Sequence, residues 1–319
     1  MKRKLSQNTF SKFYGKYGVL CIFVVEYLFF ALTTDSFFTM NNLMIVFRQT
    51  AFVGVAAVGS TALMLTGGID ISSGAVMAFS GVMVAQLTVQ QNVPLGVAIA
   101  LVLLIGIVIG IVSGFCSVYL KVSPLIATLA IQTIVKGISF LLTGASPIYG
   151  ISDAFKYIGQ GHIGIVPFPV VIMIVCFGIG YWVYNYTFVG RYIYAVGGND
   201  EAARLSGINT NLIKVATFSA SSFAAALAGV MMAGRLGSGQ PAIGEDFSMD
   251  VITAIVLGGV SITGGSGRLI GVFFGTLITG ALQNGMVQLD LSEYWQWVVK
   301  GLVLIFAVAM SNVNVKSKK

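Results

Sequence analysis

The segment GRYIYAVGGNDEAARLSG, residues Gly190 to Gly207, lies between two long apolar stretches and decides how the chain is organised. Its charged residues are Arg191, Asp200, Glu201 and Arg204. The pair Gly197 and Gly198 predicts a turn, because glycine adopts positive φ angles at little steric cost. Asn199 can then cap a short helix with acidic residues in its first turn, an arginine near its end and Gly207 as its stop. These features predict a surface helix too short to cross a membrane, which is either a docking element or a simple loop.

Composition places the chain in a membrane. Of its 319 residues, 56% are hydrophobic and only 9% are charged, and the mean hydropathy is +0.91. Soluble domains carry about 25% charged residues, so this chain lacks the polar surface that a soluble fold needs. Its 39 glycines agree with this class, because close packing of membrane helices relies on small residues.

The first apolar stretch, Tyr17 to Thr34, follows a basic segment at residues 1–16. A secretory signal peptide also begins with positive charge, but its short apolar core ends at a small-residue cleavage site. Here the stretch is long and aromatic and leads into Asp35, which favours an uncleaved first span. Glu26 within it is expected to face protein, because an ionisable group in contact with lipid is costly.

Apolar runs, measured against the ~20 residues that one helical crossing needs, give ten predicted spans. They are Tyr17–Thr34, Leu43–Leu65, Ala75–Gln90, Leu95–Tyr119, Leu125–Leu142, Ile163–Tyr184, Leu212–Gly234, Val251–Thr263, Leu269–Val287 and Trp295–Met310. The eighth is short and is expected to be broken or tilted. The predicted fold class is an all-α, polytopic membrane helix bundle, formed by a single domain over residues 1–319.

Ten crossings place both termini on one side of the membrane. With this topology, thirteen of the 18 Lys and Arg residues fall on the side of the termini. The five on the other side are Arg48, Lys136, Lys156, Arg235 and Lys300. Because cytoplasmic loops are enriched in Lys and Arg, both termini and the loop at residues 187–211 are predicted to be cytoplasmic. The net charge of +7 is thus a topology signal rather than a sign of nucleic-acid binding.

A short repeat relates two spans, because Val135-Lys136-Gly137 in the fifth is matched by Val299-Lys300-Gly301 in the tenth. If spans two to five correspond to spans seven to ten, the matched helices cross the membrane in opposite directions. Such inverted repeats are typical of transporters, whose substrate path lies at the repeat interface.

The segment LTGGIDISSG, residues Leu65–Gly74, separates spans two and three. Its glycines permit a turn, and either Asp70 or Ser72 can cap the helix that follows. We interpret this segment as a hinge beside the translocation path, with both polar residues as candidates for the path. The alternative is a tight connection between two helices.

Two spans carry polar residues at helical spacing. Those on span five are Thr128, Gln132 and Lys136, and those on span nine are Thr276, Thr279, Gln283 and Asn284. Amides and hydroxyls can bind an uncharged polyol, and polar groups at membrane depth usually face a cavity or the bundle interior. The alternative is hydrogen bonding between helices, which is worth about 0.6 kcal/mol on average.

Residues suited to catalysis or metal binding are few. His162 is the only histidine, and Cys21, Cys116 and Cys176 lie in three different spans without C-x-x-C spacing. The glycine-rich segment Leu257–Arg268 lacks the lysine of a phosphate loop. We therefore expect no enzymatic activity, no metal and no cofactor.

Four motifs carry a resemblance to a known family. They are LTGGIDISSG at Leu65–Gly74, SPLIATLA at Ser123–Ala130, GRYIYAVGGNDEAARLSGI at Gly190–Ile208, and LGGVSITGGSGRLIGVFFGTLITGALQNGM at Leu257–Met286. The chain resembles the permease subunits of bacterial ABC importers of the ribose, xylose and galactose class, and most closely those for ribose. The resemblance runs from about Phe37 to Ser311 and implies a type II-like ABC importer fold.

This resemblance implies that the Gly190–Gly207 segment is a coupling helix, which in the family fits a cleft of a cytoplasmic ATPase. The implied contact residues are Arg191, Gly197, Gly198, Asn199, Asp200, Glu201, Ala202, Ala203, Arg204 and Gly207. Further implied partners are a sugar-binding protein on the outer loops and a second permease copy, identical or related, with the path along the dimer axis. The chain itself would bind no ATP.

Alternatives remain for the substrate and the energy source. Xylose, galactose and autoinducer-2 permeases carry similar motifs, although ribose leads. A proton- or sodium-driven carrier would share the spans but needs carboxylates at the midplane, where Glu26 is the candidate. A structural or receptor-like membrane protein would not need the capped cytoplasmic helix.

Overall fold

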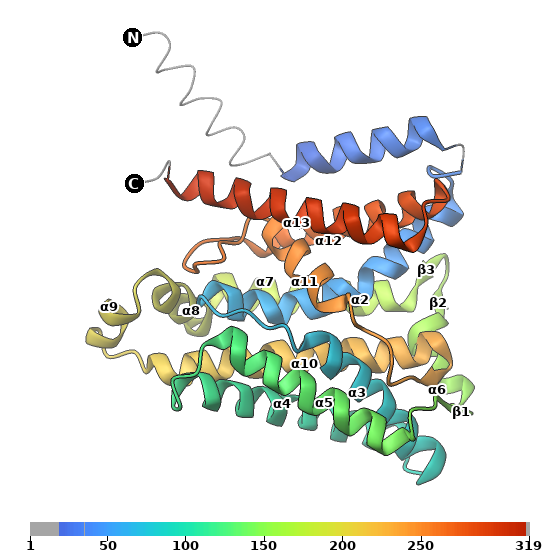
Figure 1. Ribbon diagram of the computed structural model, residues 1–319, viewed down its shortest axis with the longest axis horizontal. Coiled ribbons are helices and arrows are strands. Elements are labelled where there is room, and N and C mark those ends of the chain that lie inside the picture. The colour runs from blue at the N-terminus through green and yellow to red at the C-terminus, as the bar shows by residue number, and fades with distance from the viewer. Residues whose placement is uncertain (1–18, 35, 317–319) are drawn as a thin grey trace.

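The computed structural model describes residues 19–34 and 36–316, and the basic segment at residues 1–16 lies outside them. Long helices run side by side in a bundle with short elements at both ends (Figure 1). The end with α8 (Phe188–Gly198) and α9 (Asp200–Leu205) is called the coupling end. The opposite end, with α6 (Asp153–Gln160) and the strands, is called the loop end.

The long helices account for the ten predicted spans. They are Val19–Thr33, α2 (Met40–Leu65), α3 (Ser73–Ala85) with its π-helical continuation η1 (Gln86–Gln90), α4 (Leu95–Val118), α5 (Pro124–Thr143), α7 (Phe168–Tyr186), α10 (Thr210–Leu236), α11 (Phe247–Leu257), α12 (Leu269–Gln288) and α13 (Glu293–Lys316). Within the described residues, seven helices are long and apolar enough to cross a membrane, while Val19–Thr33 and α11 are shorter apolar helices. The prediction of an all-α, polytopic membrane fold is confirmed.

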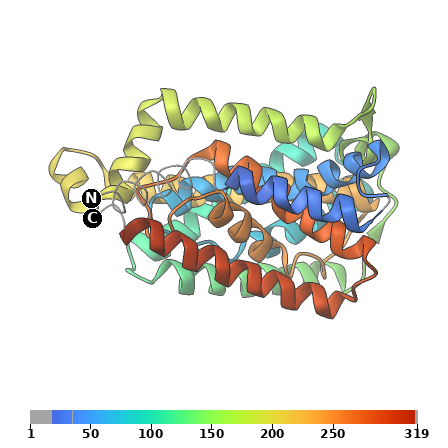
Figure 2. The same cartoon turned by 90° about the horizontal axis from the view of Figure 1, so that it is seen from above.

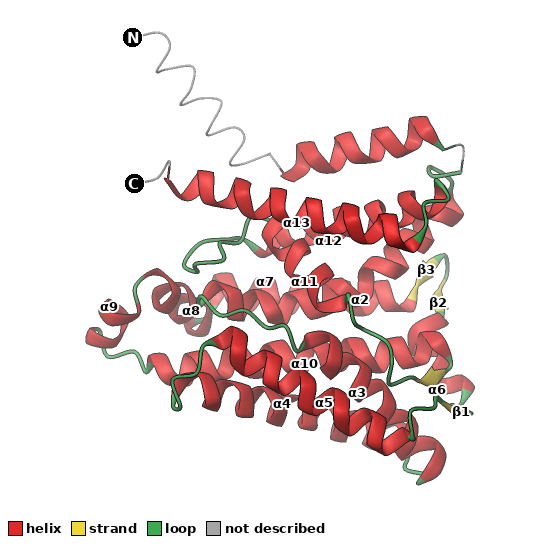
Figure 3. Ribbon diagram, viewed as in Figure 1, coloured by secondary structure: helices red, strands yellow, loops and turns green. Residues whose placement is uncertain are grey.

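Two short antiparallel strand pairs lie at the loop end (Figure 3). β1 (Ile148–Tyr149) pairs with β4 (Ser238–Gly239), and β2 (His162–Ile163) pairs with β3 (Val166–Pro167). The predicted start of the sixth span at Ile163 is therefore wrong. That residue belongs to β2, and the helix begins only at Phe168, with Pro169 in its first turn, where a missing N–H costs nothing.

Small residues bring the central helices into backbone contact. α10 packs against α2, α3 and α4. An added Cβ at Gly106 on α4 would lie 2.7 Å from Ala226 Cβ, and one at Gly114 would lie 2.9 Å from Val215 Cα, both on α10. Without a hydrophobic driving force between helices in lipid, such close van der Waals packing holds the bundle together.

Two helices begin inside the bundle rather than at its surface. α3 starts after the non-helical segment 66–72, and α11 starts after the non-helical segment 240–246. Ser73 and Ser248, near these two starts, are fully buried. α11 is 11 residues long, about 16 Å, so it covers only half of the ~30 Å core of a bilayer. The short eighth span is thus a half-helix, after which residues 258–268 return to the coupling end.

Candidate functional site

The structure has two candidate regions, namely the unit α8–α9 at the coupling end and a polar seam where α3 and α11 begin. These two are called the half-helices because each begins inside the bundle, although α3 continues through η1 to Gln90. In α9, Asn199 Oδ1 accepts a hydrogen bond from the Ala202 N–H at 2.9 Å. Gly207 has a φ of 85°, and the N–H of Ile208 bonds to the carbonyl of Ala203 at 3.1 Å, which closes the helix. The predicted capped helix and its glycine stop are confirmed.

The charges of α9 are exposed at the tip of the coupling end. Arg204 Nη2 lies 2.7 Å from Glu201 Oε1, and Lys214 Nζ lies 2.7 Å from Asp200 Oδ2, which fastens α9 to the start of α10. The hydrogen bond to Glu201 raises the pKa of Arg204 above its ordinary value. Ala202 is exposed, whereas Ala203 is buried against the bundle. The helix therefore presents a small charged surface to whatever docks at this end.

The predicted turn at Gly197 and Gly198 is wrong, because both residues end helix α8 with ordinary helical geometry. Gly197 is required for a different reason. An added Cβ there would overlap the carbonyl oxygen of Leu65 and lie 2.6 Å from the amide nitrogen of Gly265. In the described part of the chain, a Cβ at Gly198 would meet no atom within 4 Å. Only the tertiary packing distinguishes these two neighbouring glycines.

α8 rests on both glycine-rich segments at once. Gly265 donates its N–H to the carbonyl of Leu65 at 2.8 Å, and Tyr194 on α8 donates its hydroxyl to the carbonyl of Gly267 at 3.0 Å. Leu65 leads into the segment before α3, and Gly265 and Gly267 lie in the segment after α11. α8 is thereby in contact with the segment before α3 and with the segment after α11. Sequence reasoning did not single out Tyr194, although it lies within the motif at Gly190–Ile208.

The starts of the two half-helices meet at the polar seam. Ser248 Oγ on α11 accepts the N–H of Gly74 at 2.8 Å and donates to the carbonyl of Ile71 at 2.6 Å. Ser73 Oγ donates to Ser248 Oγ at 3.1 Å. An added Cβ at Gly74 would overlap the carbonyl oxygen of Gly244, so only glycine allows this approach. Ser248 thus caps α3 from another helix, which sequence spacing could not reveal.

The predicted cap of α3 by Asp70 or Ser72 is correspondingly wrong. Asp70 instead accepts the N–H of Ser72 at 2.8 Å, the Ser72 hydroxyl at 2.6 Å and the Ser221 hydroxyl at 2.7 Å. Ser221 also lies 2.9 Å from Ser60, which links α10 to α2. Asp70 is 5% exposed, so this carboxylate fixes the segment 66–72 to the bundle. Asp70 and Ser72 are both buried.

The polar face of α5 runs along the seam. Thr128 Oγ1 accepts the N–H of Ile71 at 3.3 Å, and Lys136 Nζ lies 2.7 Å from Glu245 Oε1 in the segment before α11. Between them, the half-buried Gln132 has a side-chain oxygen without a hydrogen-bond partner among the described residues. The predicted grouping of these three polar side chains on one face agrees with their positions, and Glu245 is an addition that the sequence did not single out.

A second lysine lies at the same depth as Lys136. Lys300 on α13 lies 3.0 Å from Asp250 on α11. Lys136 precedes the last residue of α5 by seven positions, and Lys300 follows the first residue of α13 by seven positions. At about 1.5 Å per residue, both lysines lie about 10 Å below the loop end. The repeated Val-Lys-Gly was the one sequence signal for this second pair.

The polar residues of α12 lie elsewhere. Thr276 and Thr279 bond to carbonyls of their own helix at 2.7 and 3.0 Å, and Asn284 accepts from Asn42 on α2 at 2.9 Å. Gln283 is half-buried. α12 packs against α2 and α11, and of these four residues Asn284 makes a hydrogen bond between helices, the kind anticipated as the alternative.

Comparison with known proteins now gives the family. Residues 42–308 match a family model described as the permease component of a branched-chain amino acid transport system. The chain belongs to this permease family. It is 38% identical to the ribose import permease protein of Haemophilus influenzae over 98% of both chains. It is 41% identical to that of Escherichia coli over 88% of both chains, and 40% identical to that of Bacillus subtilis over 88% of this chain and 87% of that one. No solved structure matches.

Proposed function

We propose that this permease is the membrane subunit of an ATP-driven importer that moves a monosaccharide, with ribose favoured, across the cytoplasmic membrane. Three ribose import permeases at 38–41% identity support the substrate class, ahead of a xylose permease at 31% and a fructose permease at 32%. The observation that carries the mechanism is the exposed helix α9, joined through α8 to the segments that flank both half-helices. A bundle without such a unit could not receive work from outside the membrane.

The coupling end is assigned to the cytoplasm. The first helix runs toward the loop end, and the end of α13 lies at the coupling end (Figure 1). Its basic residues within the described chain include Lys121, Arg191, Arg204, Lys214 and Arg268. The enrichment of Lys and Arg in cytoplasmic loops supports this orientation. Residues 187–211 then face the cytoplasm, and α6 and the strands face outward.

A partner ATPase supplies the energy for transport. Its closure on ATP moves α9, and α8 moves with it because Gly197 and Tyr194 are seated on the two glycine-rich segments. The half-helices α3 and α11 share the bonds of Ser248, so they shift as one body. This shift alternately opens the seam to each side, and the permease itself hydrolyses nothing.

The sugar path follows the face formed by α5, α11 and α13. Lys136 and Glu245 are 45% and 72% exposed in the isolated chain, although they lie at membrane depth. Charged side chains in contact with lipid are costly, so this face is covered by protein and water rather than by lipid. A second permease copy, identical or related, supplies that cover and places the path between the two chains. A sugar-binding protein at the loop end delivers the substrate.

An ion-coupled carrier is the second class considered. Its expected carboxylate, Glu26, lies beside Cys21, Phe29 and Leu282 at the edge of the bundle. It therefore belongs to the contact between the first helix and α12, away from the bonds of Ser248 at the seam. Nothing in its position favours this second function.

Reconstitution tests the proposal. Proteoliposomes with the permease, its ATPase and its binding protein should take up ribose only when ATP is present inside with the ATPase, and xylose and fructose should compete weakly. Glu201→Trp on α9 should abolish co-purification of the ATPase, whereas Asp153→Trp on α6 at the loop end should retain it. Both variants should insert into the membrane normally. Uptake driven by an ion gradient without ATP, or normal coupling in Glu201→Trp, would contradict the proposal.

A further inference from the structure

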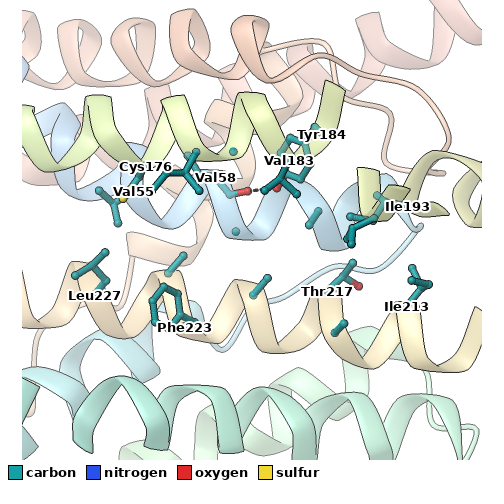
Figure 4. Close-up of a pocket in the computed structure, with 18 residues that line it drawn as sticks. Val55, Val58, Cys176, Val183, Tyr184, Ile193, Ile213, Thr217, Phe223 and Leu227 are labelled. Atoms are coloured by element: carbon teal, nitrogen blue, oxygen red, sulfur yellow. Dashed lines mark hydrogen bonds between the residues drawn. The ribbon is translucent and has the colours of Figure 1, made fainter. Parts of the chain in front are cut away.

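An apolar cavity of about 270 Å³ lies between α2, α7 and α10, in the half of the bundle nearer the coupling end (Figure 4). Its lining includes Val58, Cys176, Val183, Ile193, Ile213 and Leu227. The inner end of the wall is formed by α8, so the cavity reaches the unit that moves with the ATPase. Neither the polar seam nor the proposed sugar path includes it.

The hydroxyl groups in the lining already have hydrogen-bond partners within the protein. The Tyr184 hydroxyl donates to the carbonyl of Val58, and the Thr217 hydroxyl donates to the carbonyl of Lys214 at 2.7 Å. A sugar placed here would leave its own hydroxyls without partners, at about 1–3 kcal/mol for each buried group. The ligand that fits this cavity is therefore apolar.

The cavity faces the lipid side of the protein. Its wall residue Ile179 on α7 is 58% exposed. Figure 2 shows α7 and α13 at opposite edges of the bundle, so the charged face that includes α13 points away from the cavity. The second permease copy assigned to that charged face cannot cover the cavity as well. Hydrocarbon chains of the bilayer are what surrounds α7 on this side.

The dimensions fit one lipid chain. Along α10 the wall extends from Ile213 to Leu227, about 21 Å of helix, which exceeds the ~15 Å depth of one leaflet. An apolar cavity of about 150 Å³ already stays dry and takes up benzene, and this cavity is larger. An empty space of this size would forfeit the dispersion contacts of its lining, so filling it with methylene groups is favourable.

The charges at its inner end favour an anionic head group. Arg191 is an exposed residue of α8, the helix that forms the inner end of the wall. In the described part of the chain, no carboxylate lies within ion-pair distance of Arg191. Lys214 adjoins the lining residue Ile213, but Asp200 already pairs with it at 2.7 Å, so Arg191 is the basic residue that supplies the attraction. Basic residues at a membrane surface attract anionic lipids, at about 1 kcal/mol for each Lys or Arg.

We propose that this cavity binds one acyl chain of an anionic phospholipid from the leaflet at the coupling end. The chain fills the space between α7 and α10, and its inner part contacts α8. A bound lipid thereby braces the coupling unit against the bundle. The site requires only that the protein is embedded in a bilayer, so it holds whichever sugar is carried.

Photo-cross-linking tests the site in the full-length protein in lipid nanodiscs. Phosphatidylglycerol with a diazirine on its acyl chain should form adducts concentrated on the cavity residues of α7 and α10. Ala220→Leu narrows the cavity and Ala216→Phe blocks its exposed edge, and each should lower these adducts about tenfold, equivalent to about 1.4 kcal/mol. Ala100→Phe, on the exposed face of α4, is the matched control and should leave them unchanged.

Further outcomes distinguish an anionic phospholipid from other occupants of the cavity. Phosphatidylcholine with the same labelled chain should give several-fold fewer adducts in the cavity. Adducts spread evenly over the exposed residues of α4 and α7, or equal labelling from both lipids, would overturn the proposal. Chain-to-chain cross-links from a photoreactive group on Cys176 would also overturn it, because a second copy would then occupy the cavity. If Ala216→Phe unfolds at the same temperature as the unmodified protein, its reduced labelling is not caused by a loss of folding.

Discussion

The sharpest expectation concerns two adjacent glycines at the end of α8. Gly197→Ala should uncouple the permease, whereas Gly198→Ala should not. The added methyl carbon at Gly197 would overlap the Leu65 carbonyl oxygen and lie 2.6 Å from Gly265 N, and real Cβ atoms essentially never come closer than 3.0 Å to another atom. At Gly198 the same carbon meets no described atom within 4 Å. Both substitutions are otherwise alike, and both favour helix formation by about 1 kcal/mol.

The size of the effect of Gly197→Ala depends on the two atoms that the added Cβ would displace. Both are backbone atoms of segments that flank the half-helices, so no side chain can rotate away. Overpacking of this kind costs typically about 1–3 kcal/mol. A coupling energy of that size corresponds to a factor of about 5–150 in an equilibrium constant. The population of the state in which α8 contacts Leu65 and Gly265 should therefore fall by roughly that factor.

ATP-dependent sugar uptake in proteoliposomes is the measurement, with ATP hydrolysis and ATPase co-purification recorded on the same samples. Gly197→Ala should lower uptake by about tenfold or more while the ATPase still binds, because α9 itself is unchanged. Gly198→Ala should match the unmodified protein. Equal uptake by the two variants would refute the idea that α8 transmits force through its contact with Leu65 and Gly265.

Two further predictions concern the seam. Asp250→Asn should lower uptake and reduce the free energy of unfolding by about 2 kcal/mol, less than the ~3–5 kcal/mol of a fully buried pair, because the Asp250 and Lys300 side chains retain 18% and 21% exposure. The exchange Asp250→Lys with Lys300→Asp should recover part of both losses, and a double variant no better than the single one would count against the pair. Ser248→Ala should reduce stability by about 1–2 kcal/mol, measured as a lower Tm in detergent, because it removes the cap of α3 and a bond to Ile71. The exposed Ser146→Ala is its control, and an equal Tm for both serine variants would argue against the cap.

Local sequence features anticipated the elements that depend on neighbours in the chain. Asn199 caps α9 through an N–H three residues away, and Gly207 ends it through its own φ angle, so both were predictable. The polar face of α5 was predictable as well, because helical spacing alone puts Thr128 and Lys136 on one side. The errors arose at Gly197 and at the cap of α3, where the deciding partners, Leu65 and Ser248, are more than 100 residues away in sequence.

The sequence by itself determined that this chain lives in a bilayer as a bundle of helices. The physical reason is that apolar runs of sufficient length must enter hydrocarbon, and a single segment there can satisfy its backbone hydrogen bonds only as a helix. Tertiary structure alone decided that α3 and α11 begin inside the bundle, that Ser248 joins them, and that Gly197 seats α8 on both adjoining segments. These contacts depend on the close approach of distant backbones, which neither composition nor periodicity records.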